Sequence, residues 1–292
     1  DRMIARLESQ IDARVDQLLE PVAGEACNFV DALAYPLPMH VIADIIGIPE
    51  SDRAFVFERT QQTLDSLDPE AEPAEIGEGT DLYTYAMELA AAKRARPADD
   101  VWSTIIASGL PDDDVALFFM ILSIAGSETT RNALSHGLFA LLQGGLLHRI
   151  ADDPTLLGRT GTEEIARYTS PVLVFARDAT TDVDIAGATI AQGDRILMWY
   201  SVANRDPDVF SDPDSLDLDR DPNPHVAFGG GGPHYCLGAN LAKREITSMF
   251  TTVAQRFGRA ELVGDPVWGG PGPISNVGCS LTDLPVALTT ST

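Results

Sequence analysis

Apolar residues recur every three or four positions along the first twenty residues of the chain. This spacing places them on one face of a helix, while the charged residues between them can face water. The residues of the apolar face are Ile4, Leu7, Ile11, Val15 and Leu18. The pattern therefore predicts an amphipathic helix over residues 1–20.

Helical patterns recur along the rest of the chain, most of them before residue 145. Pro36 and Pro38 break the chain ahead of a short apolar helix that Gly47 ends, and Ser51 is the expected N-cap of the helix after it. Three acids beginning at Asp112 favour the start of a long helix, because its N-terminus carries partial positive charge. The expected helices cover residues 1–20, 39–46, 51–64, 80–96, 101–108, 112–142, 163–168 and 237–257.

Strand-like patterns appear only after residue 162. Alternating apolar residues around Gly187 and Gly193 predict a hairpin. The expected strands lie within residues 172–176, 182–194 and 195–199, with short pieces in the tail from residue 263. Acidic, proline-rich or glycine-rich stretches at 67–79 and 204–235 are expected to be loops. The predicted fold class is mainly α with a minor β portion, in a single domain over residues 1–292.

Composition excludes several classes of protein. The chain has 20 Lys and Arg against 44 Asp and Glu, a formal charge of −24, so nucleic-acid phosphates would be repelled. A hydrophobic fraction of 45% is enough to bury a core, which excludes a disordered chain. The longest apolar run, from Val115 to Ala125, is shorter than the roughly 18 residues of a membrane span.

Cysteine usage and the N-terminus bear on the compartment. Cys27, Cys236 and Cys279 are an odd number at wide spacing, which is no disulfide framework and predicts a reducing, cytoplasmic location. No basic segment followed by an apolar one marks a signal peptide. Asp1 runs directly into a helical pattern with no starting Met, so we expect a truncated N-terminus.

The strongest chemical signal is the run Phe228-Gly-Gly-Gly-Gly-Pro-His-Tyr-Cys236-Leu-Gly238. Successive glycines let the backbone approach a flat object without Cβ clashes. The helix beginning near Gly238 points its free N–H groups at the sulfur, which lowers the thiol pKa and suits a metal ligand or a nucleophile. Two alternatives remain at this point: a small buried Cys236, or a zinc site with His225 and His234, for which no further Cys or His completes a familiar spacing.

Two further motifs are informative only in combination with the cysteine loop. Ala125-Gly-Ser-Glu-Thr-Thr130 interrupts the long apolar helix, where a Thr hydroxyl can bond to the carbonyl one turn earlier. Glu164 and Arg167 share a helix face, and Arg220 could join them in a buried network. Alone, the first could be a tolerated polar stripe and the second an exposed ion pair of little consequence.

The order and spacing of these motifs, with Asn204-Arg-Asp-Pro207 between them, resemble the cytochrome P-450 family of haem-thiolate monooxygenases, of the soluble bacterial type. The resemblance covers residues 1 to about 290 and implies the P-450 fold without its N-terminal strands and first helices. Phe228 lies eight residues before Cys236, one more than is usual in the family. This variant resembles a subset of actinobacterial members that act on sterol side chains, branched lipids or terpenes.

The resemblance implies a haem b site and a role for each matching residue. Cys236 would be the proximal thiolate ligand of the iron, whose electron donation favours O–O cleavage. Glu128 and Thr129 match the acid–alcohol pair that manages protons on bound dioxygen. The cofactor-binding residues implied are Cys236, His234, Arg177, Ala125, Gly126, Phe228, Gly230 and Gly238. Among these, His234 and Arg177 would contact the propionates, and Ala125 and Gly126 would lie over the haem.

The implied reaction inserts one atom of O₂ into a C–H bond of an apolar small molecule. Its electrons would come from NAD(P)H through a ferredoxin or flavodoxin. Because such partners are acidic, the expected docking patch is basic, with candidates Lys243, Arg244 and Arg205. The expected pocket walls are the largely apolar segments 118–122, 171–175 and 274–277.

Two alternative functions compete with this one. The absent N-terminal portion supplies haem and substrate contacts in the family, so the chain could be a non-catalytic remnant that binds haem weakly. A peroxygenase using hydrogen peroxide is the other alternative. The Glu128–Thr129 pair argues against it, because direct use of peroxide needs no such proton relay.

Overall fold

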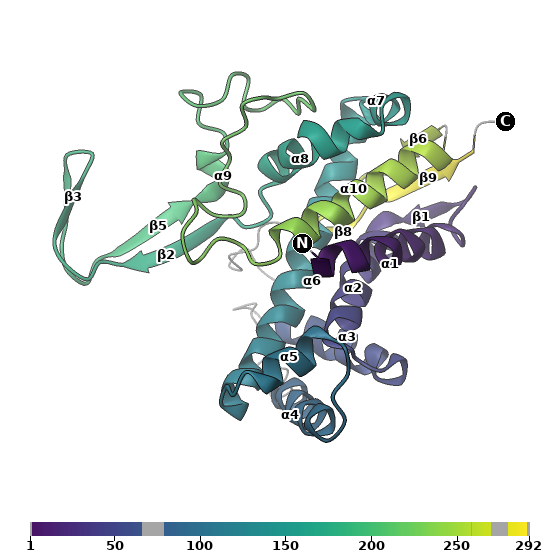
Figure 1. Ribbon diagram of the computed structural model, residues 1–292. Helices are drawn as coiled ribbons and strands as arrows, with labels where there is room; N and C mark the ends of the chain where they lie inside the picture. The colour runs from purple at the N-terminus through teal and green to yellow at the C-terminus, as the bar shows by residue number, and fades with distance from the viewer. Residues whose placement is uncertain (1, 66–78, 258, 270–279, 291–292) are drawn as a thin grey trace.

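The computed structural model describes residues 2–65, 79–257, 259–269 and 280–290. Helices dominate this part of the chain, and a long central helix, α6, runs through both halves of the molecule (Figure 1). The helices are α1 (Arg2–Leu19), η1 (Val30–Ala34), α2 (Pro36–Ile46), α3 (Glu50–Asp65), α4 (Gly79–Ala95), α5 (Val101–Ala107), α6 (Asp112–Gln143), α7 (Leu147–Asp152), η3 (Leu157–Gly161), α8 (Thr162–Thr169), α9 (Tyr200–Ala203) and α10 (Ala239–Arg256), of which η1 and η3 are π-helical.

Within the described residues, the strands form four small antiparallel sheets. They are β1 (Ala26–Asn28), β2 (Val174–Asp178), β3 (Val183–Ile185), β4 (Ala188–Ile190), β5 (Arg195–Trp199), β6 (Arg259–Leu262), β7 (Val267–Trp268), β8 (Leu281–Asp283) and β9 (Pro285–Thr289). The largest sheet has the order β1-β9-β6, and the others pair β2 with β5, β3 with β4 and β7 with β8. The β2–β5 ribbon and the β3–β4 hairpin project from the body (Figure 1). The predicted mainly α class with a minor β portion is confirmed.

Several element boundaries differ from expectation for local reasons. Pro36 and Pro38 do not break the chain before α2 but occupy its first turn, where a proline costs no intrahelical hydrogen bond. Ser51 is not an N-cap, because α3 already begins at Glu50. Gly47 does end α2 as predicted, with a left-handed φ of 72°. The loop expected at 67–79 and the pocket wall expected at 274–277 lie outside the described residues, apart from the start of α4.

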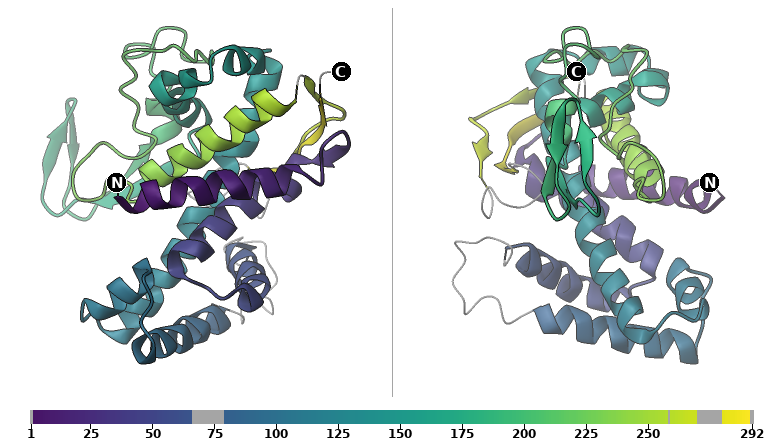
Figure 2. Two further views of the ribbon diagram at one scale, coloured as in Figure 1. Left: turned by 45° about the vertical axis from the view of Figure 1, so that its right-hand side comes forward. Right: turned by 90° about the vertical axis from the view of Figure 1, so that its left-hand side faces the viewer.

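Two hydrophobic clusters follow the length of α6. The first packs α1, η1, α10 and the β9 strand around the second half of α6, and it buries Leu7, Ile11 and Val15 of the predicted amphipathic face. The second packs α2, α4 and α5 around the first half, where Trp102 is fully buried. Figure 2 shows α1 and α10 side by side over one half of α6 and the α3–α5 helices around the other.

Gly126 lets α2 approach α6 closely. A Cβ added at Gly126 would lie 2.6 Å from Cδ1 of Ile42, a buried side chain of α2. This glycine therefore serves the contact between two helices, which differs from the expected position of Gly126 over the haem. Its neighbour Ala125 is exposed.

We expect Gly126→Val to destabilise the fold by about 1–3 kcal/mol, because the added atoms overpack the α2–α6 contact. The measurement is the free energy of unfolding in urea. Ala125→Val adds the valine side chain at the exposed neighbouring position and should change stability by no more than about 0.5 kcal/mol. Equal losses for the two variants would contradict the packing role of Gly126.

Candidate functional site

The loop that carries Cys236 is held open by left-handed glycines. Gly229, Gly231 and Gly232 have φ values of 96°, 94° and 79°, a region that other residues rarely adopt. A Cβ added at Gly230 would meet no atom within 4 Å, so the space beside the loop is free. The loop closes through the N–H of Cys236, which donates to the Phe228 carbonyl at 2.9 Å. An exposed cysteine beside an open cradle fits a flat ligand bound through sulfur.

The pKa of Cys236 differs from the expectation. Although the residue is exposed, neighbouring atoms partly desolvate its sulfur, and this raises the pKa of the thiol above its usual value. The N–H of Gly238 and the charge of Lys243 act in the predicted direction and lower the pKa, but burial outweighs both. The neutral thiol is therefore favoured in the protein alone. Coordination to a metal would deprotonate the sulfur.

One stripe of α6 presents apolar side chains to solvent. Leu117 and Ile121 are 51% and 59% exposed, and Ala125 is exposed one turn further on. Thr129 continues the stripe, and its hydroxyl donates to the Ala125 carbonyl at 2.7 Å, as predicted. An exposed apolar stripe on the central helix of a fold indicates a surface that a ligand or another segment covers.

Glu128 does not share the exposed stripe with Thr129. Its carboxylate is buried, and it accepts hydrogen bonds from Arg131 at 3.0 Å and from Asn132 at 3.2 Å. The hydroxyl of Ser280 donates to the same carboxylate at 2.9 Å. Because Ser280 lies 152 residues further along the chain, no sequence pattern indicated this partner.

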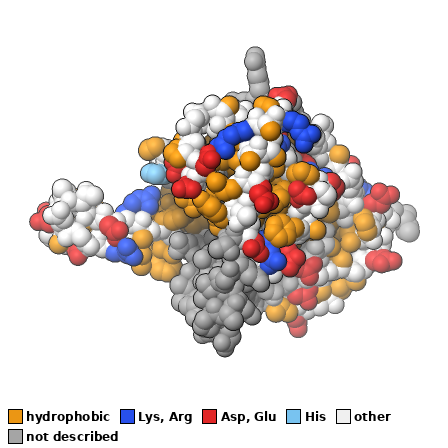
Figure 3. Space-filling model, turned by 90° about the horizontal axis from the view of Figure 1, so that it is seen from below, with side chains coloured by type: hydrophobic (Ala, Val, Ile, Leu, Met, Phe, Trp, Pro, Cys, Tyr) orange, Lys and Arg blue, Asp and Glu red, His pale blue; other side chains and the backbone are white. Residues whose placement is uncertain are grey.

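Arg177 and His234 are exposed, and within the described ranges no acidic side chain pairs with either of them. Among the described residues, the side chain of Arg177 donates only to the neighbouring Ala176 carbonyl. Phe175, on the same face of the β2–β5 ribbon as Arg177, is an exposed apolar residue, and Leu197 and Trp199 are exposed on the other face. Figure 3 shows hydrophobic side chains beside Lys and Arg where the projecting ribbon meets the body. Cationic groups at the rim of an apolar surface can bind the carboxylates of an amphipathic ligand.

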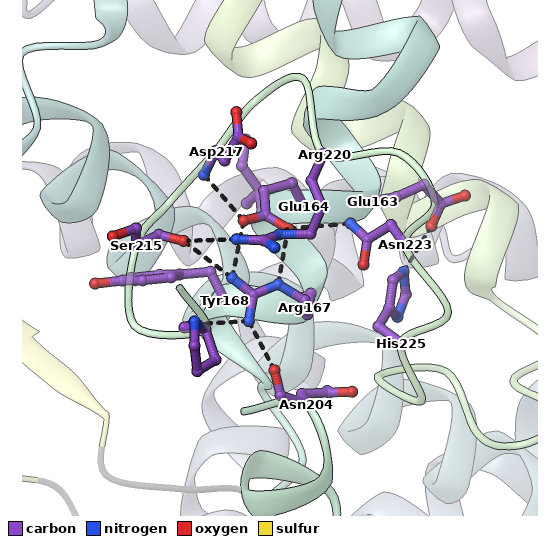
Figure 4. Close-up of polar contacts among 12 residues, drawn as sticks. Glu163, Glu164, Arg167, Tyr168, Asn204, Ser215, Asp217, Arg220, Asn223 and His225 are labelled. Carbon is purple, nitrogen blue, oxygen red and sulfur yellow. Dashed lines mark hydrogen bonds and ion pairs between the residues drawn. The ribbon is translucent and has the colours of Figure 1, made fainter. Parts of the chain in front are cut away.

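The network predicted around Glu164 is present and larger than expected (Figure 4). Arg167 binds the Glu164 carboxylate through two hydrogen bonds of 2.7 and 2.8 Å, and Arg220 adds a third of 3.0 Å. The side chains of Glu164 and Arg167 are 0% exposed, and that of Arg220 is 8% exposed. The sequence did not indicate two further donors, the N–H of Asp217 and the amide of Asn223.

The two arginines also organise the irregular segment before the cysteine loop. Arg167 donates to the carbonyls of Asn204, Pro213 and Ser215, and Arg220 donates to that of Ser211. Backbone carbonyls that no helix or strand satisfies thus find partners in buried guanidinium groups.

The basic residues expected to dock a redox partner are all paired with other groups. Lys243 binds Glu163 at 2.9 Å, and Arg244 binds Asp12 of α1 at 2.6 Å. Arg205 donates to the Tyr168 carbonyl at 2.8 Å. Their positive charge is therefore partly used within the molecule.

The zinc alternative finds no support in the structure. His225 forms a 3.0 Å contact with Glu163. Across the described residues, no group of three or more His, Cys, Asp or Glu side chains is placed to hold a metal ion. Cys236, His234 and the glycine cradle instead fit haem, in which the iron needs a single ligand from the protein and the porphyrin carries the carboxylates.

Known proteins are similar to this chain over most of its length. The profile of the cytochrome P450 family matches residues 162–265. The chain is 38% identical over 263 residues to a methyl-branched lipid omega-hydroxylase of Mycobacterium tuberculosis, covering 85% of this chain and 61% of that protein. It is 35% identical over 276 residues to a steroid C26-monooxygenase of Mycolicibacterium smegmatis, covering 91% and 63%.

A solved structure shares both fold and sequence with the chain. Cytochrome P450 CYP268A2 of Mycobacterium marinum, in complex with pseudoionone, superposes with a TM-score of 0.89 at 35% identity, covering 98% of this chain and 72% of that one. The chain belongs to the cytochrome P450 family, whose members are haem-thiolate monooxygenases that bind haem b. It spans somewhat less than two thirds of the length of the two curated relatives. None of its described helices is both long and apolar enough to cross a bilayer.

We expect Glu164→Ala to destabilise the protein by about 3–5 kcal/mol, because it leaves two buried guanidinium groups without their carboxylate. The free energy of unfolding in urea is the measurement. Asp153→Asn removes the acid of an ion pair with Arg159 whose side chains are about half exposed, and it should cost no more than about 1 kcal/mol. Similar losses of unfolding free energy for the two variants would show that the buried network contributes no more stability than an exposed ion pair.

The pKa of Glu163 predicts how stability depends on pH. Hydrogen bonds from His225 and Lys243 lower this pKa from 4.5 to about 2. A lowered carboxyl pKa stabilises the fold fully above about pH 4.5, and this contribution is lost as the pH falls towards 2. Glu163→Gln should therefore be less stable than the wild type near neutral pH, with a difference that shrinks below pH 4.5. Urea unfolding of both proteins from about pH 7 to about pH 3 tests this, and a constant difference would contradict it.

Proposed function

We propose that this chain forms the haem site of a monooxygenase that inserts one oxygen atom of O₂ into a C–H bond of an apolar small molecule. Electrons would come from NAD(P)H through a ferredoxin or flavodoxin, and the location would be cytoplasmic. The observation that carries the proposal is Cys236, exposed beside a cradle of left-handed glycines at the start of α10. Haem, when bound, supplies the chemistry that activates O₂.

The surrounding residues fall into three groups with different proposed contacts to the cofactor. Cys236 would ligate the iron, with Phe228, Gly230 and Gly238 shaping the proximal face. Arg177 and His234, which have no acidic partner among the described residues, would bind the propionates. Ala125 lies on the exposed stripe of α6 and would contact the haem.

Thr129 and Glu128 would manage protons at this site. The Thr129 hydroxyl lies on the partly exposed side of α6, where its Oγ1 would hold a water and supply a proton once it releases the Ala125 carbonyl. The Glu128 carboxylate lies behind it among Arg131, Asn132 and Ser280. Glu128 would therefore have to exchange these contacts for water in order to pass a proton to Thr129.

The proposed substrate is a sterol, a branched lipid or a terpene. Leu117 and Ile121 on α6, and Leu197 and Trp199 on β5, present apolar surface to solvent. Burial of such surface favours an apolar ligand. The names of the relatives, a methyl-branched lipid omega-hydroxylase and a steroid C26-monooxygenase, support the same class.

The test is the spectrum of the haem-loaded, dithionite-reduced protein under carbon monoxide. We expect the red-shifted Soret band of a thiolate ligand in the wild type and its loss in Cys236→Ser. Cys27→Ser is the matched control, because Cys27 lies in β1 within the β1-β9-β6 sheet, and it should keep the band. A band that survives Cys236→Ser would overturn the assignment.

Turnover separates the alternative functions. The haem-loaded protein should hydroxylate a sterol, branched lipid or terpene when NAD(P)H, a reductase and a ferredoxin or flavodoxin are supplied. Activity with hydrogen peroxide alone would indicate a peroxygenase. Absence of a thiolate-type band in the wild type would indicate a remnant that does not hold haem.

A further inference from the structure

Glu163, at the start of α8, contacts two side chains that lie on opposite sides of Cys236 in the sequence. Nε2 of His225 lies 3.0 Å from Oε2, and Nζ of Lys243 lies 2.9 Å from Oε1. One oxygen of the carboxylate therefore binds the segment before the cysteine and the other binds the helix after it. A single carboxylate closes the base of the loop formed by residues 225–243.

Phe228 connects this closure to the cysteine itself. The Phe228 ring lies beside both residues that bind Glu163. Its centroid is 6.0 Å from the centroid of the His225 ring and 5.5 Å from Nζ of Lys243. The carbonyl of the same residue accepts the N–H of Cys236 at 2.9 Å. Glu163 is therefore joined to the backbone of Cys236 through a continuous series of contacts.

The neighbouring acids of α8 hold different parts of the chain. Adjacent residues of a helix point about 100° apart, and Figure 4 shows Glu163 next to His225 while Glu164 lies among the arginines. Glu164 binds the irregular segment before the cysteine loop as far as Asn223, and Glu163 binds the next contact residue along the chain, His225. The predicted network around Glu164 thus ends just before the cysteine loop begins.

We propose that Glu163 is a positioning residue for Cys236, with His225 and Lys243 as its two arms. Its carboxylate keeps the ends of the loop together, so that the Phe228–Cys236 hydrogen bond persists and the sulfur faces the glycine cradle. In this role Lys243 serves the loop rather than a redox partner. The inference rests on the proposed function, because the value of an ordered loop lies in directing the sulfur to haem iron.

Amide hydrogen exchange of the full chain tests the closure without haem. We expect Glu163→Gln and Lys243→Met to speed the exchange of the peptide spanning residues 226–238 on the order of fivefold to tenfold, because local opening becomes easier. Lys243→Arg should restore most of the protection. Arg244→Met removes the same charge one residue further on, where the partner is Asp12 of α1, and it should leave this peptide unchanged.

The carbon monoxide spectrum provides a second measurement that a docking role would not affect. With dithionite as reductant and no protein partner, Glu163→Gln and Lys243→Met at matched haem content should lose part of the thiolate-type band. Arg244→Met should keep it. If Lys243 only docked a partner, Lys243→Met would keep it as well.

The outcomes separate this inference from the proposed function. Wild-type exchange in both Glu163→Gln and Lys243→Met, or an equal increase in Arg244→Met, would overturn the positioning role. Faster exchange in the two variants alone, combined with a wild type that lacks the thiolate-type band, would uphold the loop closure and count against the haem site.

Discussion

The buried carboxylate of Glu164 is the contact on which the cysteine side of the molecule depends. Residues 204–235 contain almost no regular structure, so their backbone groups cannot satisfy one another as those of a helix do. Arg167 and Arg220 supply the missing donors, but two buried positive charges are tolerable only beside a buried negative one. Glu164 meets that requirement, and the irregular segment acquires a fixed path.

A fixed path matters because the chemistry of a thiolate ligand depends on the direction of one sulfur atom. The glycine run gives the loop freedom to follow a flat ligand, and freedom of this kind has an entropic cost when the loop is ordered. Contacts from a rigid helix offset the cost. Helix α8 provides them twice, through Glu164 to the preceding segment and through Glu163 to both ends of the loop.

Different faces of the central helix α6 have different roles. Leu117, Ile121 and Ala125 form an exposed stripe at a spacing of four residues, and Thr129 continues it at a half-buried position. Gly126 allows α2 to pack closely, and Glu128 turns inward to Arg131 and Ser280. One helix therefore presents an apolar stripe to solvent, joins two hydrophobic clusters and carries a buried carboxylate next to a half-buried hydroxyl.

Local sequence patterns were enough to predict the long helix over residues 112–142, the open cysteine loop and the pairing of Glu164 with Arg167. Each depends on interactions within a few residues: helical periodicity, the conformational freedom of glycine, and the proximity of positions i and i+3. Three contacts emerged only from the folded chain: Ser280 binds Glu128, Glu163 joins His225 to Lys243, and Gly126 faces α2. The tertiary structure also reversed the direction expected for the pKa of Cys236. The physical reason is that desolvation and ion pairing depend on which distant segments pack together, and no local pattern contains that information.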